Sequence, residues 1–345
     1  MKFRDFFNIG HRQVGGGADC LVIAEAGVSH FGDMGLAREL VDMAAEAEAD
    51  VFKTQIFDVD HLLSDQAMEW KNRLRARNLN FDQIEELKNR CESQGLIFMT
   101  TAHDESRINW LERLDVEAVK VGSGEKSNPQ FITKLAKLKK PMIISTGMCD
   151  EQDLRSIVGA CFESENESVA LLHCVTSYPA PDAQVNLAAM DTMRSFFSGP
   201  VGYSDHTVDG LALLAAVGRG ADVVERHITI KKNVANAQDW KVSSGPDDFS
   251  NFVKSIRRIE SMIGDGVKKS ADCENEGKEW ALKSLFAARD IGIGHAITSD
   301  DLISRRPGTG IPPSKMSEIV GKSLVTNLKK GEMVKFDMLV NAVSK

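Results

Sequence analysis

Two histidines, His206 and His227, occupy similar surroundings in the middle of the chain. Each follows a short apolar run, and the apolar segment between them, residues 211–217, has the composition of a helix. This is the pattern of strand, helix and strand, and in a parallel sheet the ends of two such strands lie side by side. Two imidazoles at neighbouring strand ends predict a site for a divalent metal ion, whereas either histidine alone would be an ordinary buried residue.

Two lysines, Lys53 and Lys120, interrupt other apolar runs. A buried ammonium group without a partner is costly, so each lysine needs an anion. One interpretation is a structural salt bridge with Glu25 or Glu225. The other is that the lysines and nearby hydroxyl groups bind a phosphate and a carboxylate. These hydroxyl groups stand at the ends of predicted strands and belong to Thr101, Ser123 and Ser145. Any one of them alone could simply cap the end of its strand.

Further polar residues stand at the ends of predicted strands, and their value lies in their convergence on one region. They are Gln55, Thr100, Thr146, His173, Thr176, Tyr178 and Ser204. Arg306 is a different case, because the proline and glycine that follow it stiffen its loop. That loop is a good platform for a guanidinium group, although an exposed surface arginine is the simpler interpretation.

The elements that must position these residues repeat in a regular order. Strand-like runs occupy residues 21–26, 51–57, 96–102, 116–123, 141–147, 169–175, 201–204 and 222–228, and a helical pattern follows each run. Eight strand and helix pairs predict an α/β protein with a (β/α)8 TIM barrel, and a doubly wound open sheet is the alternative. In a barrel the polar strand ends form the active-site face. Residues 58–79 are polar, and we expect an irregular loop there.

The chain is expected to contain two domains. Residues 1–265 form the predicted catalytic barrel, and the charged residues 266–284 form a linker. Residues 285–345 form a small β-rich domain, in which the segments 287–302 and 325–339 resemble each other.

Composition excludes several classes of protein. The 345 residues carry a net charge of −8, which argues against a nucleic-acid surface. A basic cluster at residues 71–77 is a solvated surface or a weak site for a substrate anion. The 6 cysteines form no CxxC pair, and no apolar run reaches membrane-spanning length, so we expect a cytoplasmic protein without a membrane partner.

Ordered motifs over nearly the whole chain resemble those of the sialic acid synthase family. These enzymes are phosphoenolpyruvate-dependent nonulosonic acid synthases with a C-terminal antifreeze-like (SAF, β-clip) domain. The matching segments are, in order, IAEAGVSHFGD, KTQIF, KVGSGEKSNPQFI, ISTGM, HCVTSYPAP, GYSDHT, VVERHITI, RRPGTGI and IVGKSL.

The resemblance implies the condensation of phosphoenolpyruvate with an N-acylated amino sugar, which yields a nonulosonic acid and phosphate. It implies a divalent metal, usually Mn²⁺ with Mg²⁺ or Co²⁺ as alternatives, on His206 and His227. It also implies a domain-swapped homodimer, in which Arg306 reaches the sugar site of the partner subunit. Glu25 matches the catalytic glutamate. The implied donor site comprises Lys53, Thr101, Lys120, Ser123 and Ser145, and the other implied substrate-binding residues are Gln55, Thr176, Tyr178, Ser204 and Asp239.

Three departures from the family pattern fall on the acceptor side. Residues 29–32 read Ser-His-Phe-Gly in place of Asn-His-Asn-Gly, Thr176 replaces Asn or Ser, and Trp240 replaces a common His. The acceptor is therefore left open between N-acetylmannosamine and a dideoxy-diamino hexose. Two other functions are alternatives: condensation with a phosphorylated sugar, as in octulosonate-phosphate synthases, and non-catalytic sugar binding.

Overall fold

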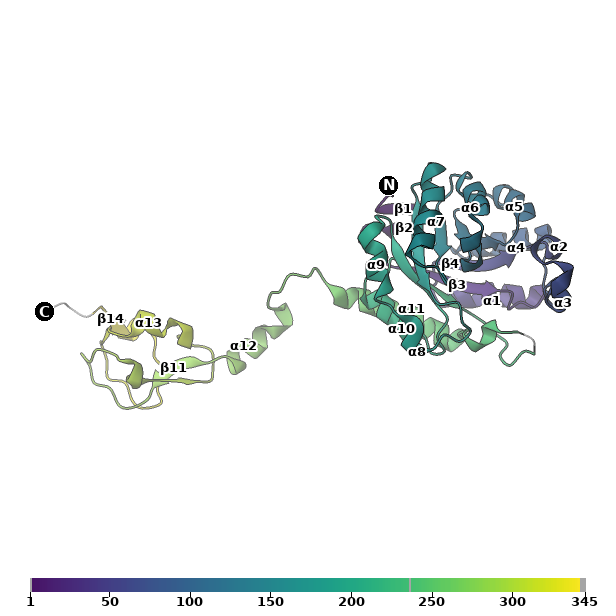
Figure 1. Ribbon diagram of the computed structural model, residues 1–345. Coiled ribbons are helices and arrows are strands. Elements are labelled where there is room, and N and C mark those ends of the chain that lie inside the picture. The colour runs from purple at the N-terminus through teal and green to yellow at the C-terminus, as the bar shows by residue number, and fades with distance from the viewer. Residues whose placement is uncertain (1, 236, 342–345) are drawn as a thin grey trace. The chain divides into compact units, whose positions relative to one another are not determined.

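The computed structural model describes residues 2–235 and 237–341. The chain divides into two compact units, residues 1–265 and 266–345. Figure 1 shows strands surrounded by helices in the first unit and short strands in the second.

The first unit is a closed barrel of eight parallel strands in the order β10-β3-β4-β5-β6-β7-β8-β9. Closure of the sheet confirms the predicted (β/α)8 barrel and makes the doubly wound alternative wrong. Adjacent strands place Glu25 beside Lys53 and Thr101 beside Lys120. The strands are β3 (Leu21–Gly27), β4 (Val51–Ile56), β5 (Ile97–Ala102), β6 (Val119–Val121), β7 (Met142–Ser145), β8 (Val169–Cys174), β9 (Val201–Asp205) and β10 (Val223–His227).

The helices between the strands bury one apolar face against the outside of the barrel. Asp33 caps the first of them, because its side chain accepts a hydrogen bond from the Gly35 amide at 2.7 Å. The main helices are α1 (Met34–Glu46), α4 (Phe81–Ser93), α5 (Ile108–Arg113), α6 (Pro129–Ala136), α7 (Glu151–Glu163), α9 (Ala189–Phe196), α10 (Leu211–Gly218) and α11 (Pro246–Ile263), with a short α8 (Asp182–Val185) before α9.

An N-terminal hairpin closes one end of the barrel. Its strands, β1 (Phe6–Ile9) and β2 (Arg12–Gly15), pair in antiparallel fashion. Phe7, Ile9 and Val14 form one buried cluster with inward residues near the strand starts, such as Leu21 and Val51. The sequence pattern did not predict this hairpin. Because apolar side chains fill the N-terminal end, a polar cavity can form only at the C-terminal end of the strands.

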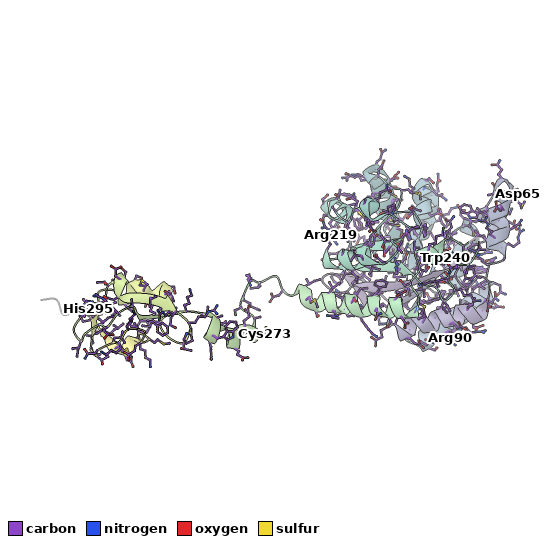
Figure 2. All side chains as sticks on the ribbon, turned by 90° about the horizontal axis from the view of Figure 1, so that it is seen from below. Asp65, Arg90, Arg219, Trp240, Cys273 and His295 are labelled. Carbon is purple, nitrogen blue, oxygen red and sulfur yellow. The ribbon has the colours of Figure 1, made fainter. Side chains whose placement is uncertain are left out.

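The expected irregular loop at residues 58–79 is instead largely helical, so that prediction was wrong. It contains α2 (Val59–Leu62), a 3₁₀ turn at Asp65–Ala67 and α3 (Met68–Arg75). Ion pairs hold the segment, with Lys71 Nζ lying 2.9 Å from Asp60 and 2.6 Å from Asp65 at the periphery of the unit (Figure 2). Most of the basic residues at 71–77 thus pair with acidic residues of their own segment, which is the pattern expected of a solvated surface.

The second unit is built from short strands and turns around its own apolar core. Its strands are β11 (Ser284–Ala287), β12 (Leu302–Arg305), β13 (Ser323–Leu324) and β14 (Leu339–Val340), and its short helix is α13 (Met316–Ile319). The segment expected to be a linker contains α12 (Asn275–Ala281). Over the described residues, no helix has the length and apolar character needed to cross a membrane.

Candidate active site at the C-terminal end of the barrel

Alternate residues of each strand point into the barrel, and those nearest the C-terminal ends line one cavity. The cavity contains twelve of the predicted site residues together with six others, of which only Glu225 was considered from the sequence, as a salt-bridge partner. The predicted residues are Glu25, Lys53, Gln55, Thr101, Lys120, Ser123, Ser145, Thr176, Tyr178, Ser204, His206 and His227. The additional residues are His103, Gly122, Gly124, Glu125, Cys174 and Glu225.

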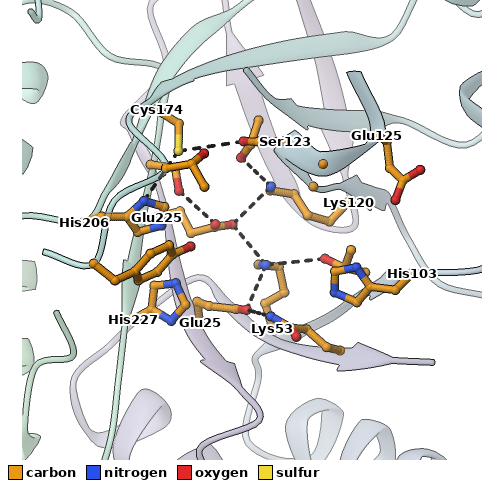
Figure 3. A pocket seen from close by; sticks show the side chains of 18 residues that line it. Glu25, Lys53, His103, Lys120, Ser123, Glu125, Cys174, His206, Glu225 and His227 are labelled. Atoms are coloured by element: carbon orange, nitrogen blue, oxygen red, sulfur yellow. Dashed lines mark hydrogen bonds and ion pairs between the residues drawn. The ribbon is translucent and has the colours of Figure 1, made fainter. Parts of the chain in front are cut away.

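Two lysines and two glutamates form a buried charge cluster in this cavity (Figure 3). The Nζ atom of Lys53 lies 2.8 Å from Glu25 Oε2 and 3.4 Å from Glu225 Oε2. The Nζ atom of Lys120 lies 3.8 Å from Glu225 Oε2 and donates a hydrogen bond to Ser145 Oγ at 2.6 Å. The salt bridges considered from the sequence are therefore present, and they line the cavity rather than sit behind it.

Burial and mutual charge shift the pKa values of this cluster. Burial raises the pKa of Glu25, and the neighbouring Glu225 raises it further, against the opposing effect of Lys53. Burial lowers the pKa of Lys120, and repulsion from Lys53 adds to that effect. Burial tends to raise the pKa of Glu225, but both lysines favour its charged form, and its pKa lies below the usual range. A carboxyl group with a raised pKa, such as Glu25, is suited to accept and return a proton near neutral pH.

Hydroxyl groups complete this part of the wall. Ser204 Oγ donates to Glu225 at 3.0 Å, and Ser123 Oγ accepts a hydrogen bond from the Gly147 amide at 2.9 Å. Gly147 is required here, since a Cβ atom at this position would lie 2.1 Å from Thr176 Oγ1. The backbone thus brings the ends of β6, β7 and β8 close together.

His206 and His227 lie together on one wall of the cavity, with ring centroids 5.3 Å apart, and Tyr178 stacks 4.2 Å from His206. His206 Nδ1 is 2.8 Å from the Val175 carbonyl oxygen, which fixes the ring and leaves Nε2 for another partner. His227 Nδ1 is buried and has no hydrogen-bond partner in the described residues. Burial lowers the pKa of His227 to about 3, so its imidazole is neutral, as metal binding requires.

The pair therefore fits a metal held by two protein nitrogens, with its other positions open to water and substrate. Within residues 2–235 and 237–341, no cluster of three or more His, Cys, Asp or Glu side chains is suited to enclose an ion. The metal itself stays a prediction.

Two predicted site residues lie outside the lining of the cavity. Asp239 Oδ2 lies 3.7 Å from the position of a Cβ built on Gly27, and Glu25 Oε1 and Gln55 Nε2 lie 3.3 and 3.4 Å from the same point. Asp239 is therefore near Glu25 and Gln55, two of the site residues named from the sequence. Arg306 belongs to the second unit, where its Nε donates to the Ala281 carbonyl at 3.1 Å and its guanidinium lies 5.6 Å from the Trp280 ring. Its role at the acceptor stays a prediction.

Strand alternation corrects part of the polar inventory. His173 is outside the cavity, with its Nε2 2.7 Å from the Val185 carbonyl oxygen, and the next residue, Cys174, lines the cavity. Thr100 and Thr146 likewise bond to backbone carbonyl groups of neighbouring strands. The same alternation would have found His103, two residues after Thr101 on the inward face.

Two histidines, one buried and one half-buried in the cavity wall, make the fold sensitive to acid. Burial lowers the pKa of His30 and of His103 to about 4, from an unfolded value near 6.5. Between these values the unfolded chain binds more protons, so the free energy of unfolding is complete above about pH 6.5 and falls on acidification towards pH 4, by roughly 3 kcal/mol per histidine. Urea denaturation of the metal-free protein between pH 7 and 4.5 measures this slope. In His103→Phe, the number of protons bound on unfolding should fall by about one, which makes the slope shallower. An unchanged slope would contradict the lowered pKa of His103.

A parallel barrel with a polar cavity of lysines, carboxylates and histidines at the strand ends is an enzyme fold with an anion-binding site. Residues 40–268 match the NeuB family, and residues 283–340 match the SAF domain. The chain belongs to the NeuB family.

Known proteins resemble the chain over most of its length. The N,N'-diacetyllegionaminic acid synthase of Legionella pneumophila is 40% identical over 92% of this chain and 94% of its own length. The synthase of the same name from Campylobacter jejuni is 34% identical over 91% of this chain and 98% of its own. The crystal structure of N-acetylneuraminic acid (sialic acid) synthetase from Leptospira borgpetersenii with citrate has a TM-score of 0.75 and 28% identity, covering 80% of this chain and 96% of that one.

Proposed function

We propose that this protein condenses phosphoenolpyruvate with an N-acylated amino sugar to give a nonulosonic acid and phosphate. The observation that carries this function is the cavity that places two buried lysines opposite a pair of histidines. The lysines suit an anionic donor, and the histidines suit the metal-assisted binding of a carbonyl group. The function agrees with that of the NeuB relatives, which are named as nonulosonic acid synthases.

The donor binds at the charge cluster. Lys120 has only a 3.8 Å ion pair with Glu225, so it has the weaker carboxylate contact of the two lysines and the stronger need for an anion. The carboxylate and phosphate groups of phosphoenolpyruvate satisfy Lys120 and Lys53, assisted by the hydroxyl groups of Thr101, Ser123 and Ser145. Positioning of this kind lowers a barrier by roughly 7–11 kcal/mol.

The acceptor binds as an open-chain aldehyde beside His206 and His227. A divalent metal on these residues, Mn²⁺ by preference with Mg²⁺ or Co²⁺ as alternatives, would supply Lewis-acid polarisation of the aldehyde carbonyl. C3 of phosphoenolpyruvate forms a bond to the aldehyde carbon, whose oxygen gains a proton. The proton on that oxygen comes from solvent. C2 becomes cationic and takes up water, and Glu25 receives the first proton that the water loses. When the C–O bond to phosphate breaks, the C2 hydroxyl group gives its proton to the departing phosphate and becomes the carbonyl of the product, and Glu25 returns its proton to solvent. Gln55 donates to Glu25 Oε1 at 2.9 Å and keeps the carboxylate oriented for this transfer.

The acceptor we propose is a hexose with two N-acetyl groups, because relatives at 40% and 34% identity are named N,N'-diacetyllegionaminic acid synthases. The test supplies phosphoenolpyruvate with a panel of acceptors, namely a diacetamido hexose, N-acetylmannosamine and phosphorylated sugars. Phosphate release and product mass are measured. Preferred turnover of the diacetamido hexose supports the proposal. Turnover only of phosphorylated sugars that lack an N-acyl group would favour the octulosonate-phosphate type. If no acceptor gives phosphate release, the remaining alternative is sugar binding without catalysis.

We further propose a domain-swapped homodimer in the cytoplasm, where a reducing environment suits 6 free cysteines. Arg306 contacts the N-acyl carbonyl of the acceptor from the partner subunit. Arg306→Ala should raise the acceptor KM about tenfold, the size of one hydrogen bond from a charged group, with little change in the KM of phosphoenolpyruvate.

The neighbouring exposed Arg305 provides a matched control, and Arg305→Ala should leave both constants unchanged. Mixing Arg306→Ala with His227→Ala subunits should restore a fraction of sites with the wild-type acceptor KM, because one site of each mixed dimer is intact. An unchanged acceptor KM in Arg306→Ala would remove this residue from the site.

A further inference from the structure

His103 lines the active cavity without a role in the scheme above. It follows β5 on the same inward face as Met99 and Thr101. Its backbone amide donates to the Ile56 carbonyl at 3.0 Å. Its ring lies 6.5 Å from the Phe57 ring, and its Cε1 lies 3.8 Å from the position that a Cβ on Gly122 would occupy. These contacts fix the imidazole in the wall.

The ring is a neutral hydrogen-bonding group among charged ones. Burial lowers the pKa of His103 to about 4, repulsion from Lys53 on β4 and Lys120 on β6 adds to this, and Asp104 opposes it. A neutral imidazole has one N–H donor and one acceptor nitrogen. Its ring nitrogens form no hydrogen bond within residues 2–235 and 237–341. The donor is therefore free for a ligand.

Position in the cavity indicates which ligand group it meets. In Figure 3, His103 lies on the far side of Lys53 and Lys120 from His206 and His227. The histidine pair faces the acceptor aldehyde, so His103 is on the donor side. The phosphate of phosphoenolpyruvate has three terminal oxygens and the larger charge, and it needs more donors than two lysines that also pair with carboxylates.

We propose that His103 is a donor-binding residue whose N–H group donates a hydrogen bond to the phosphate of phosphoenolpyruvate. The inference rests on the proposed function and adds to it a phosphate contact. A neutral donor suits this place, because a third cation beside two buried lysines would be repelled.

The test compares His103→Phe, which keeps the ring volume and removes the donor, with His103→Asn, which keeps an N–H donor. His11→Asn, at an exposed residue in the turn of the β1–β2 hairpin, is the control for loss of an imidazole. The wild-type protein is first assayed for condensation. Inorganic phosphate and pyruvate are then titrated calorimetrically, so that binding is measured without catalysis.

In His103→Phe we expect the Kd of inorganic phosphate and the KM of phosphoenolpyruvate to rise about tenfold, the size of one hydrogen bond to a charged group. The Kd of pyruvate and the acceptor KM should stay within about twofold. His103→Asn should recover most of the loss, and His11→Asn should match the wild type. If His103→Phe does not fold, His103→Leu provides a second variant without a donor.

Unchanged phosphate binding in a folded donor-less variant would overturn the proposal. Weaker binding of pyruvate with unchanged binding of phosphate would overturn it as well, because His103 would then face the carboxylate. Failure of the proposed function is separate, since it would show as an absence of phosphate release by the wild-type protein.

Discussion

His206→Ala and His227→Ala are each expected to reduce condensation by about a thousandfold, which corresponds to about 4 kcal/mol of lost transition-state stabilisation. The reason is that the two rings, 5.3 Å apart, supply the protein nitrogens proposed to hold the divalent metal. Both side chains line the cavity and the surrounding barrel strands keep their backbone pairing, so we expect the variants to fold. Phosphate release measures the activity, and calorimetric titration with Mn²⁺ measures the metal affinity without substrate.

A nearby half-buried histidine provides the control. His173 is on the outward face of β8, bonded to the Val185 carbonyl oxygen, and His173→Ala should keep its metal affinity even if it loses stability. Circular dichroism checks that all three variants fold. Full activity after thorough chelation, or wild-type Mn²⁺ affinity in both cavity variants, would remove the metal from the mechanism.

Glu25→Gln is expected to lower kcat by about 10²–10⁴-fold, with the KM of phosphoenolpyruvate changed only a few-fold. The amide has the shape of the carboxylate but cannot take the proton of the attacking water. Lys53 keeps Glu225 as an ion-pair partner at 3.4 Å, so the variant does not leave a buried ammonium group unpaired. Steady-state phosphate release at varied donor concentration separates the two constants.

The matched control is Glu105→Gln, because the Glu105 side chain is 55% exposed in a surface ion pair with Lys134, and we expect no change in either constant. A Glu25→Gln variant with wild-type kcat and a raised donor KM would mean that Glu25 serves only to hold Lys53. Glu25→Asp, which keeps a carboxylate one methylene shorter, should retain part of the activity.

The barrel could be predicted because its signals are local. Eight apolar runs alternate with helical patterns, and each run matches a strand within a few residues, as 169–175 matches β8. The N-terminal hairpin could not be found in this way, because Phe7, Ile9 and Val14 are buried only by residues brought to the barrel interior by other strands. The helices in residues 58–79 were missed for a different reason, since ion pairs between α2 and α3, such as Lys71 with Asp60, support a sequence of low hydrophobicity.

The cavity was predicted in outline and corrected in detail. The rule that strand ends form the site named thirteen of the lining residues, with Glu225 among them. Taking every polar residue at a strand end also included His173, Thr100 and Thr146, which face outward. Alternation along the strands decides this, and it replaces His173 by Cys174 and adds His103. Which alternate residues of a strand face inward is determined by which of its apolar residues fill the barrel interior.

By itself, the sequence determined a barrel with two lysines and two histidines at strand ends, followed by a β-rich domain. Hydrophobic periodicity and motif order are properties of neighbouring residues, so they can be read without coordinates. Only the tertiary structure decided that Lys53 pairs with both Glu25 and Glu225, that His227 is neutral, and that His103 lines the cavity beyond the two lysines. Ion pairing and burial depend on distances between strands far apart in the chain, and these distances exist only once the barrel has closed.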